Sequence, residues 1–264
     1  MVSAQVIVPP YLSNCRSTNN CTDDWSFYCA LSYPSAKIYN LSPSLSSSPQ
    51  TTNNPPSPSR PQNHQQIHHE DFSSSFPFPK GFFNAISFRF LPSSSDSNLP
   101  FILSECRRVL EPGGYLEATV LDVDLLGNVG PKARKAVDLA KTIMHRENYT
   151  SSNSTSTQSE KVLRLLSKRG FESPHKCFVG LPVVSNVPIT GGDEVNSAVL
   201  SSVGRWWYTR CYERVITSQG EVMRRSMWNE RGLLRECEER ETAFRMLVAY
   251  ARKPVKRIST SGLI

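Results

Sequence analysis

The sequence predicts an α/β fold with a mostly parallel sheet. Short runs of β-branched and aromatic residues alternate along the chain with segments whose apolar residues recur at helical spacing. One strand–helix–strand unit, residues 82–121, turns at Glu111-Pro112-Gly113-Gly114 and has the form of the crossover that joins parallel strands. The length of 264 residues suits one sizeable α/β domain, alone or with a small helical appendage.

The first part of the domain, residues 1–42, is predicted to form a strand, a helix and a second strand. The β-branched run at 4–8 stops at Pro9-Pro10, which fits a buried strand that ends in a turn. Residues 25–31 are predicted to be helical, and residues 37–41 to form the next strand.

Residues 43–75 are predicted to be a disordered, low-complexity insertion. The stretch 43–66 is rich in Ser, Pro, Asn and Gln, and such a composition cannot bury enough apolar surface to offset the entropy of ordering the chain. The end of the insertion carries histidine and acidic side chains of the kind that bind metals, but in a polar, solvated loop we expect no metal site. These residues are His64, His68, His69, Glu70 and Asp71.

The strand–helix–strand unit opens the second part of the domain, residues 76–253. Residues 82–91 are dense in aromatic and β-branched side chains and predict a strand. The residues at 99–110 place their apolar side chains on one helical face. Pro112 cannot continue that helix, and the two glycines after it allow the chain to reverse into a strand at 115–121.

Helical patterns dominate the rest of this part. The sequence Thr157-Gln158-Ser159-Glu160 is a capping box that begins one helix. The later helices are predicted to be a lid at about 193–243, followed by a buried strand at 244–251 and a flexible tail at 254–264. The other helical patterns lie at 131–144, 193–212 and 229–243.

Composition argues against several classes of function. The 30 basic and 23 acidic residues give a net charge of +7, but they interleave along helices, so we expect a solvated basic surface and no nucleic-acid partner. No run of 18 apolar residues occurs, so no membrane association is expected. The seven cysteines show no zinc-ligand spacing and are expected to be reduced thiols. A location in the cytoplasm or the nucleus follows, with the basic segment 252–257 as a solvated tail or, less favoured, a nuclear address.

Two segments of the second part resemble a known family. Phe83-Asn84-Ala85-Ile86-Ser87 and the stretch from Glu105 to Tyr115 are similar to the fourth-strand and "h-x-R-h-L-K-P-G-G" signatures of class I S-adenosylmethionine-dependent methyltransferases. The C-terminal part, including Gly204-Arg205-Trp206 and Met227-Trp228-Asn229, looks similar to uncharacterised fungal methyltransferase-like proteins. The resemblance implies a Rossmann-like class I methyltransferase fold, a seven-stranded sheet with helices on both faces and C-terminal helical additions.

The resemblance also implies where S-adenosyl-L-methionine would bind, because in this fold the cofactor lies across the carboxyl ends of the first, second and fourth strands. This chain departs from the family there. It has no glycine before Gly81, Pro9 lacks an N–H donor, and the uncharged Ser42 stands where the family has an acidic residue. The implied contacts are Val8, Pro9, Pro10, Ser42, Ser87, Phe88 and Arg89.

Two functions follow from these observations. The first is methyl transfer to an unknown, small-molecule acceptor, with the cofactor held unconventionally. The second is a catalytically inactive methyltransferase-like protein that regulates or scaffolds a protein partner, since a fold does not imply an activity. A third interpretation is a truncated or mispredicted gene product, because the polar stretches 12–22 and 43–66 look like intruders.

Three further groups of side chains have both a chemical and a structural interpretation. His145 and His175 can act as bases, but lone histidines in a polar context are favoured as surface residues. Asp122 and Asp124 follow the strand at 115–121 and either face an acceptor or cap a turn, with neither alternative favoured. Aromatic residues of the lid either cover an acceptor or, as we favour, pack the helices against the sheet. They are Trp206, Trp207, Tyr208, Tyr212 and Trp228.

Overall fold

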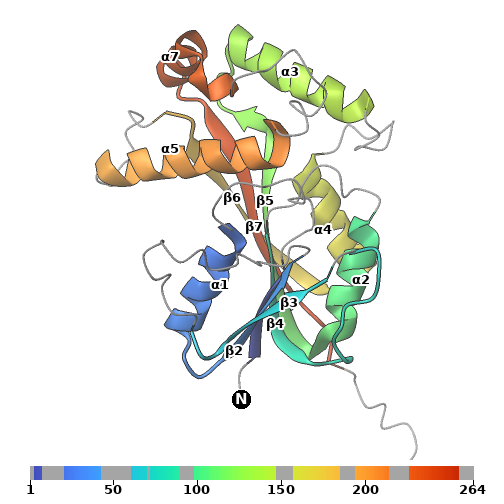
Figure 1. The fold of residues 1–264 in the computed structure, drawn as a ribbon. Helices are drawn as coiled ribbons and strands as arrows, with labels where there is room; N and C mark the ends of the chain where they lie inside the picture. Colours follow the sequence, from blue (N-terminus) through green and yellow to red (C-terminus); the bar gives the residue numbers. More distant parts are fainter. Residues whose placement is uncertain are drawn as a thin grey trace, which may run out of the picture.

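The computed structural model has an α/β Rossmann-like fold, in which a mixed sheet carries helices on both faces (Figure 1). The sequence prediction of this fold class is confirmed. The residues that the structure describes are 3–7, 21–42, 61–69, 72–89, 98–146, 157–184, 194–213 and 226–255.

One sheet contains all the described strands, in the order β3-β2-β1-β4-β5-β7-β6. Neighbouring strands from β3 to β5 pair in parallel, whereas β7 is antiparallel to both β5 and β6. The strands are β1 (Ser3–Ile7), β2 (Lys37–Ser42), β3 (His64–His68), β4 (Phe83–Arg89), β5 (Leu110–Leu126), β6 (Glu172–Pro182) and β7 (Ala243–Arg252).

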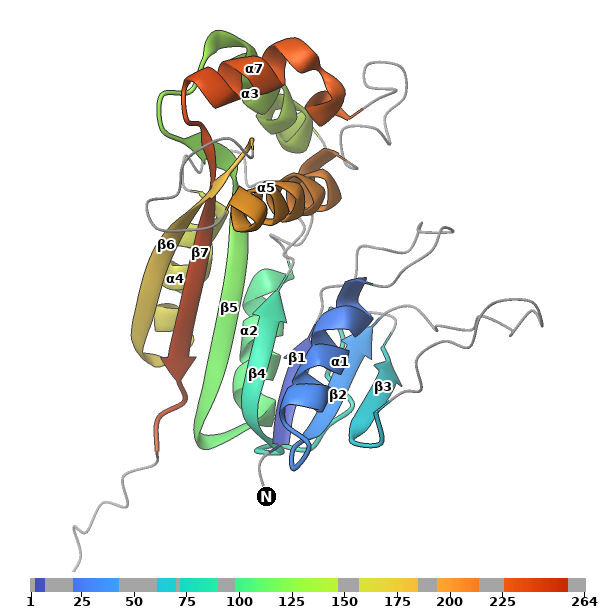
Figure 2. The ribbon, with the colours of Figure 1, turned by 90° about the vertical axis from the view of Figure 1, so that its left-hand side faces the viewer.

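The helices form a layer on each face of the sheet and a group at one end. In Figure 2, α1 and α5 cover the near face, α2 and α4 the far face, and α3 and α7 lie beyond the end of β5. None of the described helices is long and apolar enough to cross a membrane. The helices are α1 (Cys21–Ser32), α2 (Leu99–Val109), α3 (Pro131–Arg146), α4 (Gln158–Lys168), α5 (Glu194–Tyr208), the π-helical η2 (Thr209–Glu213), the 3₁₀ turn η3 (Met227–Asn229) and α7 (Arg231–Glu239).

Two hydrophobic clusters form most of the core. The first lies between the sheet and the helices α2 and α4, and includes Phe88, Leu103 and Leu166, all fully buried. The second surrounds Tyr208 and Phe244 below α5, α3 and α7. Burying each large apolar side chain contributes roughly 1.5–3 kcal/mol.

The turn at Pro112-Gly113-Gly114 lies where the sequence predicted it, at the start of the long strand β5. Gly113 has a φ of 87°, which favours glycine, and a Cβ on Gly114 would lie 2.8 Å from the carbonyl oxygen of Asn84. The N–H of Gly113 donates to the Lys253 carbonyl at 2.8 Å, and the N–H of Lys253 donates to the Gly114 carbonyl at 2.8 Å. The turn therefore joins the start of β5 to the end of β7.

The predicted insertion at 43–75 is wrong for residues 61–69 and 72–75, which have defined structure. His64–His68 form β3, which pairs in parallel with β2. His64 is only 4% exposed, and its Nε2 lies 2.8 Å from the hydroxyl of Ser26. Composition failed here because main-chain hydrogen bonds and one buried histidine, rather than an apolar run, stabilise this strand. Residues 43–60, 70 and 71 lie outside the described residues.

Three predicted boundaries also differ. The strand predicted at 115–121 continues to Leu126. The helix predicted at 229–243 ends at Glu239, where Glu241 has a φ of 51° and turns the chain into β7. The pattern at 193–212 is α-helical only to Tyr208 and then becomes π-helical. Tertiary contacts decide such ends, and periodicity alone does not contain them.

Candidate functional site

The candidate site is the point in the sheet where the strand order reverses. From β1, the next strands β2 and β3 lie on one side, while β4 and β5 lie on the other. Ile7 pairs with both Leu41 of β2 and Phe88 of β4, so the carboxyl ends of the three strands lie side by side. Open α/β sheets bind ligands in the crevice outside such a reversal.

Four side chains meet beside this reversal, and we call Trp25, Ser87, Arg89 and Glu117 the switch-point cluster. Arg89 is its centre: Nη2 lies 2.5 Å from Glu117 Oε1, and Nε donates to the hydroxyl of Ser87 at 3.1 Å. Its guanidinium carbon lies 3.6 Å from the centroid of the Trp25 ring. The Arg89 side chain is 19% exposed and that of Glu117 is 36% exposed, so solvent reaches the pair.

Strand alternation explains why these side chains meet. Successive side chains of a strand point to opposite faces, so Ser87 and Arg89 share one face of β4 and Phe88 points to the other. Glu117 is the register partner of Ser87 on β5 and lies on the same face. Trp25 comes from α1, which covers that face of the sheet (Figure 2).

The electrostatics of the cluster are nearly balanced. One cation and one anion pair with each other, and the indole face of Trp25 adds a cation–π contact. The indole Nε1 of Trp25 is buried and has no acceptor among the described residues. Burial raises the pKa of the nearby Cys29 thiol to about 11, although Arg89 lowers it and Glu117 raises it further. Cys29 is therefore a protonated thiol at neutral pH and not a nucleophile.

The predicted cofactor contacts fall into three groups: some lie in the switch-point cluster, one is buried in the core, and the rest lie outside the described residues. Ser87 and Arg89 lie together in the switch-point cluster. Phe88 is 0% exposed, because its side chain points into the first hydrophobic cluster, so only its backbone faces the crevice. Ser42 ends β2, but its side chain lies outside the described residues, as do Val8, Pro9 and Pro10 altogether.

Two members of the cluster, Glu117 and Trp25, were not predicted from the sequence. Glu117 had a usable signal, since the alternation of the predicted strand puts it on the same face as a neighbouring strand's Ser87 and Arg89. Trp25 had none, because the helix could be placed against the sheet only once the sheet was known.

No protein-family model matches this chain, and no curated protein matches it. Solved structures do resemble it. An S-adenosylmethionine-dependent methyltransferase from Methanosarcina mazei has a TM-score of 0.49 and 12% identity, over 97% of this chain and 95% of its own. A Haemonchus contortus phosphoethanolamine N-methyltransferase 2 has a TM-score of 0.46 and 13% identity, over 96% of this chain and 50% of its own. A Streptomyces coelicolor geranyl diphosphate C-methyltransferase has a TM-score of 0.44 and 11% identity, over 96% of this chain and 75% of its own.

These neighbours are methyltransferases that use S-adenosylmethionine. The chain spans about half the length of the Haemonchus enzyme. All three TM-scores are below 0.5, so the assignment to the Rossmann-like fold depends on the strand order and not on these neighbours.

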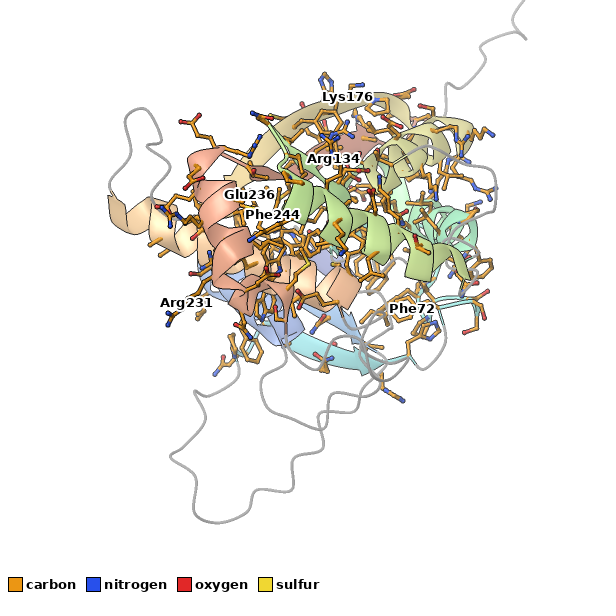
Figure 3. The ribbon with its side chains drawn as sticks, turned by 90° about the horizontal axis from the view of Figure 1, so that it is seen from above. Phe72, Arg134, Lys176, Arg231, Glu236 and Phe244 are labelled. Atoms are coloured by element: carbon orange, nitrogen blue, oxygen red, sulfur yellow. The ribbon has the colours of Figure 1, made fainter. Side chains whose placement is uncertain are left out.

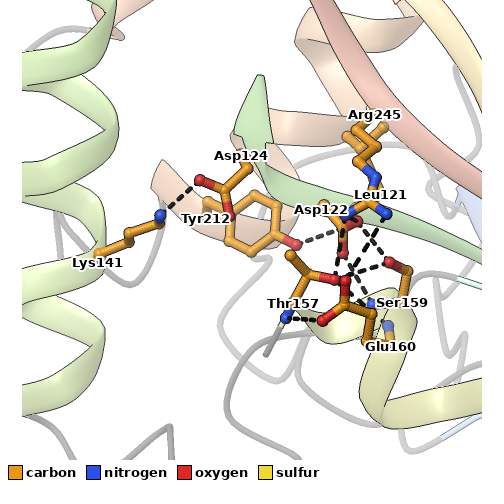
Figure 4. Close-up of polar contacts among 9 residues, drawn as sticks. All are labelled: Leu121, Asp122, Asp124, Lys141, Thr157, Ser159, Glu160, Tyr212 and Arg245. Atoms are coloured by element: carbon orange, nitrogen blue, oxygen red, sulfur yellow. Dashed lines mark hydrogen bonds and ion pairs between the residues drawn. The ribbon is translucent and has the colours of Figure 1, made fainter. Parts of the chain in front are cut away.

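Asp122, which the sequence left between two roles, is a structural residue. It lies within β5, is 0% exposed, and accepts hydrogen bonds from the Ser159 N–H at 2.8 Å and the Ser159 hydroxyl at 2.6 Å (Figure 4). Arg245 Nη1 lies 3.4 Å from Asp122 Oδ2, the oxygen that also accepts from the Ser159 hydroxyl. Burial raises the pKa of Asp122, against the opposing effects of the Ser159 hydrogen bonds and Arg245. The carboxylate thus holds the start of α4, on the face of the sheet opposite the switch-point cluster.

The remaining candidates also have structural partners. Asp124 Oδ1 lies 2.5 Å from Lys141 Nζ of α3. His175 is exposed on the edge strand β6 and stacks on Tyr250, with 4.8 Å between the ring centroids. The side chain of His145 lies outside the described residues. No group of metal-ligating side chains occurs within the described part of the chain.

The lid aromatics belong to the core, as we favoured. The hydroxyl of Tyr208 donates to the Val123 carbonyl at 3.0 Å, and that of Tyr212 donates to the Leu121 carbonyl. Both rings are fully buried beside Phe244, which lies at the centre of the second hydrophobic cluster (Figure 3). In their described residues, α5 and η2 therefore cover the sheet and are not an open lid.

A hollow of about 500 Å³ lies beyond the carboxyl end of β5, between α3 and the η3–α7 segment. Glu236 of α7 joins the two sides, since its carboxylate accepts from the N–H groups of Lys132 at 3.2 Å and Ala133 at 3.0 Å. Polar and apolar groups both line the hollow, including Lys135, Asn229 and Leu233. It is large enough for a small molecule.

Proposed function

We propose that this chain is an S-adenosylmethionine-dependent methyltransferase that acts on a small-molecule acceptor. One observation carries the proposal: the strand order β3-β2-β1-β4-β5-β7-β6, with its reversal between β1 and β4. That crevice is the position that the resemblance of the Glu111–Gly114 segment assigns to the cofactor.

The switch-point cluster has the chemistry that the cofactor requires. Its methionine part carries a carboxylate, an ammonium group and a cationic sulfonium. Arg89 would hold the carboxylate and Glu117 the ammonium group. The indole face of Trp25 already accommodates a cation at 3.6 Å, and its unpaired Nε1 would donate to a ribose or carboxylate oxygen. The bound group would supply an electrophilic methyl for transfer to a nucleophile.

In this proposal the residues of the cluster bind and orient, and they move no proton. The Cys29 thiol stays protonated at neutral pH, and Glu117 is committed to a cation. Rate enhancement would therefore come mainly from holding the acceptor in line with the methyl group.

The test is calorimetric titration of the full chain with S-adenosylhomocysteine. We expect binding that Arg89→Ala weakens at least about tenfold, since a charge-assisted contact contributes about 1.5–3 kcal/mol. The matched control is Arg235→Ala, which removes an arginine from an exposed ion pair with Glu239 on α7 and should leave binding unchanged. No binding at millimolar ligand, in protein that unfolds cooperatively, would exclude the methyltransferase.

One observation favours the second candidate, a non-catalytic protein of this fold. Arg89 is already held by Glu117, Ser87 and Trp25, so its guanidinium is paired within the protein. In that case neither the native chain nor Arg89→Ala would bind the cofactor product. Under the methyltransferase proposal the native chain binds and the variant binds less.

A further inference from the structure

A second, larger hollow lies at the opposite end of the sheet, where the parallel strands begin. Its volume is about 850 Å³. Cationic side chains from four separate segments line it, and no carboxylate does. The lining residues are Lys80, Gly81, Ser104, Arg107, Arg108, Pro112, Lys168, Arg169, Lys253 and Pro254.

Two of the six cations have clear structural partners. Arg108 is paired with Glu105, with Nη2 2.7 Å from Oε2, and also donates to the main-chain carbonyls of Phe76 and Phe78, in the segment before β4. Lys253 Nζ donates to the carbonyls of Arg107 at 2.6 Å and Leu110 at 2.5 Å, at the end of α2. These two residues stabilise the fold and are not available to a ligand.

The other four cations are Lys80, Arg107, Lys168 and Arg169. No carboxylate of the described residues lies within ion-pair distance of them. The Nε of Arg169 is buried and has no acceptor within that part of the chain. Gly170 has a φ of 72°, and a Cβ there would lie 3.3 Å from Arg107 Nη2, so the glycine leaves room for that guanidinium.

A simpler explanation is that these cations offset the negative ends of α2 and α4, which both point to the hollow. Each helix end amounts to roughly half a negative charge, so the two ends together balance about one cation. Lys253 already contacts the end of α2. The helix ends therefore leave most of the positive charge in the hollow uncompensated.

We propose that this hollow binds a ligand with several linked phosphates, such as a polyphosphate chain or a nucleoside triphosphate. Its volume is within the range of about 300–1,000 Å³ for small-molecule sites. Two guanidinium groups provide paired donors for phosphate oxygens, and two ammonium groups add charge. The site is distinct from the switch-point cluster, since it lies at the other end of the strands.

The test is calorimetric titration of the full chain with tripolyphosphate at about 0.1 M salt, where exposed charges separated by more than about 10 Å are screened. The variant Lys80→Gln/Lys168→Gln removes two exposed cations that have no carboxylate partner among the described residues, and it should weaken binding at least about tenfold. The control Lys176→Gln/Arg231→Gln removes the same charge from positions away from the hollow, on β6 and α7 (Figure 3), and should change binding less than about twofold.

ATP in place of tripolyphosphate separates two sources of the same chemistry. Equal affinity assigns the site to phosphates alone, tighter ATP binding assigns it to a nucleotide, and both support the proposal. Absence of binding at about 1 mM, equal weakening in the two double variants, or tighter binding of a single-stranded oligonucleotide than of tripolyphosphate would overturn it. Binding of S-adenosylhomocysteine should be the same in all three proteins, so failure here is separate from failure of the methyltransferase proposal.

Discussion

Two carboxylates on one strand, Glu117 and Asp122, have opposite environments. Glu117 is 36% exposed and contacts one arginine at the crevice. Asp122 lies five positions later on the opposite face, is 0% exposed, and accepts from Ser159 twice while facing Arg245. Asp122 is enclosed and held by three contacts, whereas the solvent-accessible Glu117 can exchange its partner for a ligand. Burial and the number of contacts within the protein, rather than residue type, distinguish a structural carboxylate from a candidate binding carboxylate.

The largest expected effect comes from removing Asp122, the buried carboxylate. Asp122→Ala leaves the Ser159 N–H and hydroxyl without their buried acceptor and removes the nearer of the two carboxylates that Arg245 faces, and breaking such a buried network costs about 3–5 kcal/mol. Urea unfolding followed by circular dichroism measures the loss. A change below about 1 kcal/mol would contradict the structural role of Asp122.

Removing the half-exposed carboxylate should act on binding instead. Glu117→Gln is expected to change the free energy of unfolding by less than about 1 kcal/mol, because solvent screens the pair with Arg89. Affinity for S-adenosylhomocysteine should fall about tenfold, since the ammonium group loses its charged partner. The matched control is Asp124→Asn, a carboxylate of the same strand whose ion pair with Lys141 of α3 is broken. This variant should leave affinity unchanged.

The pH dependence of stability should reveal the buried environment of Asp122. The pKa of Asp122 is raised above its ordinary value of 3.8, mainly by burial, so the folded state holds its proton more tightly than the unfolded state. Its contribution to stability is then complete below pH 3.8 and is lost as the pH rises through the folded-state pKa. Asp122→Asn should remove this downward slope, measured as the unfolding free energy between about pH 4 and pH 7.

The smallest effect is expected at the cap of α4, next to Asp122. The Thr157 hydroxyl accepts from the Glu160 N–H at 3.4 Å and the Glu160 carboxylate accepts from the Thr157 N–H at 3.2 Å. Thr157→Ala should cost about 1 kcal/mol, as expected for loss of an N-cap. A cost as large as that of Asp122→Ala would mean that the cap, and not the carboxylate, holds the helix start.

The local features that depend on neighbouring residues could be predicted from the sequence. The turn at Pro112-Gly114, the capping box at Thr157 and the aromatic packing around Tyr208 follow from residue chemistry and spacing, and the structure confirms each. Ser87 and Arg89 were placed at the crevice because the end of a predicted strand defines them. Their role as cofactor contacts stays a prediction.

The features that were missed depend on contacts between distant segments. The strand β3 could not be predicted from the sequence, because its polar His64 is stabilised by Ser26, which lies 38 positions away. Asp122 could be assigned only when β5 was seen to continue past Leu121 and to face Ser159. Trp25 joins the site through the packing of a helix on a sheet. No local pattern contains such pairings, since register and packing decide them.

The long strand β5 has a consequence for how the molecule opens. Leu116 and Val120 belong to the first hydrophobic cluster and Leu121 to the second, and the partner strand β7 is divided in the same way between Leu247 and Phe244. Neither cluster can lose its packing without exposing amides that the other also protects. We therefore expect the central amides of β5 and β7 to exchange with deuterium only through global unfolding, as one cooperative unit.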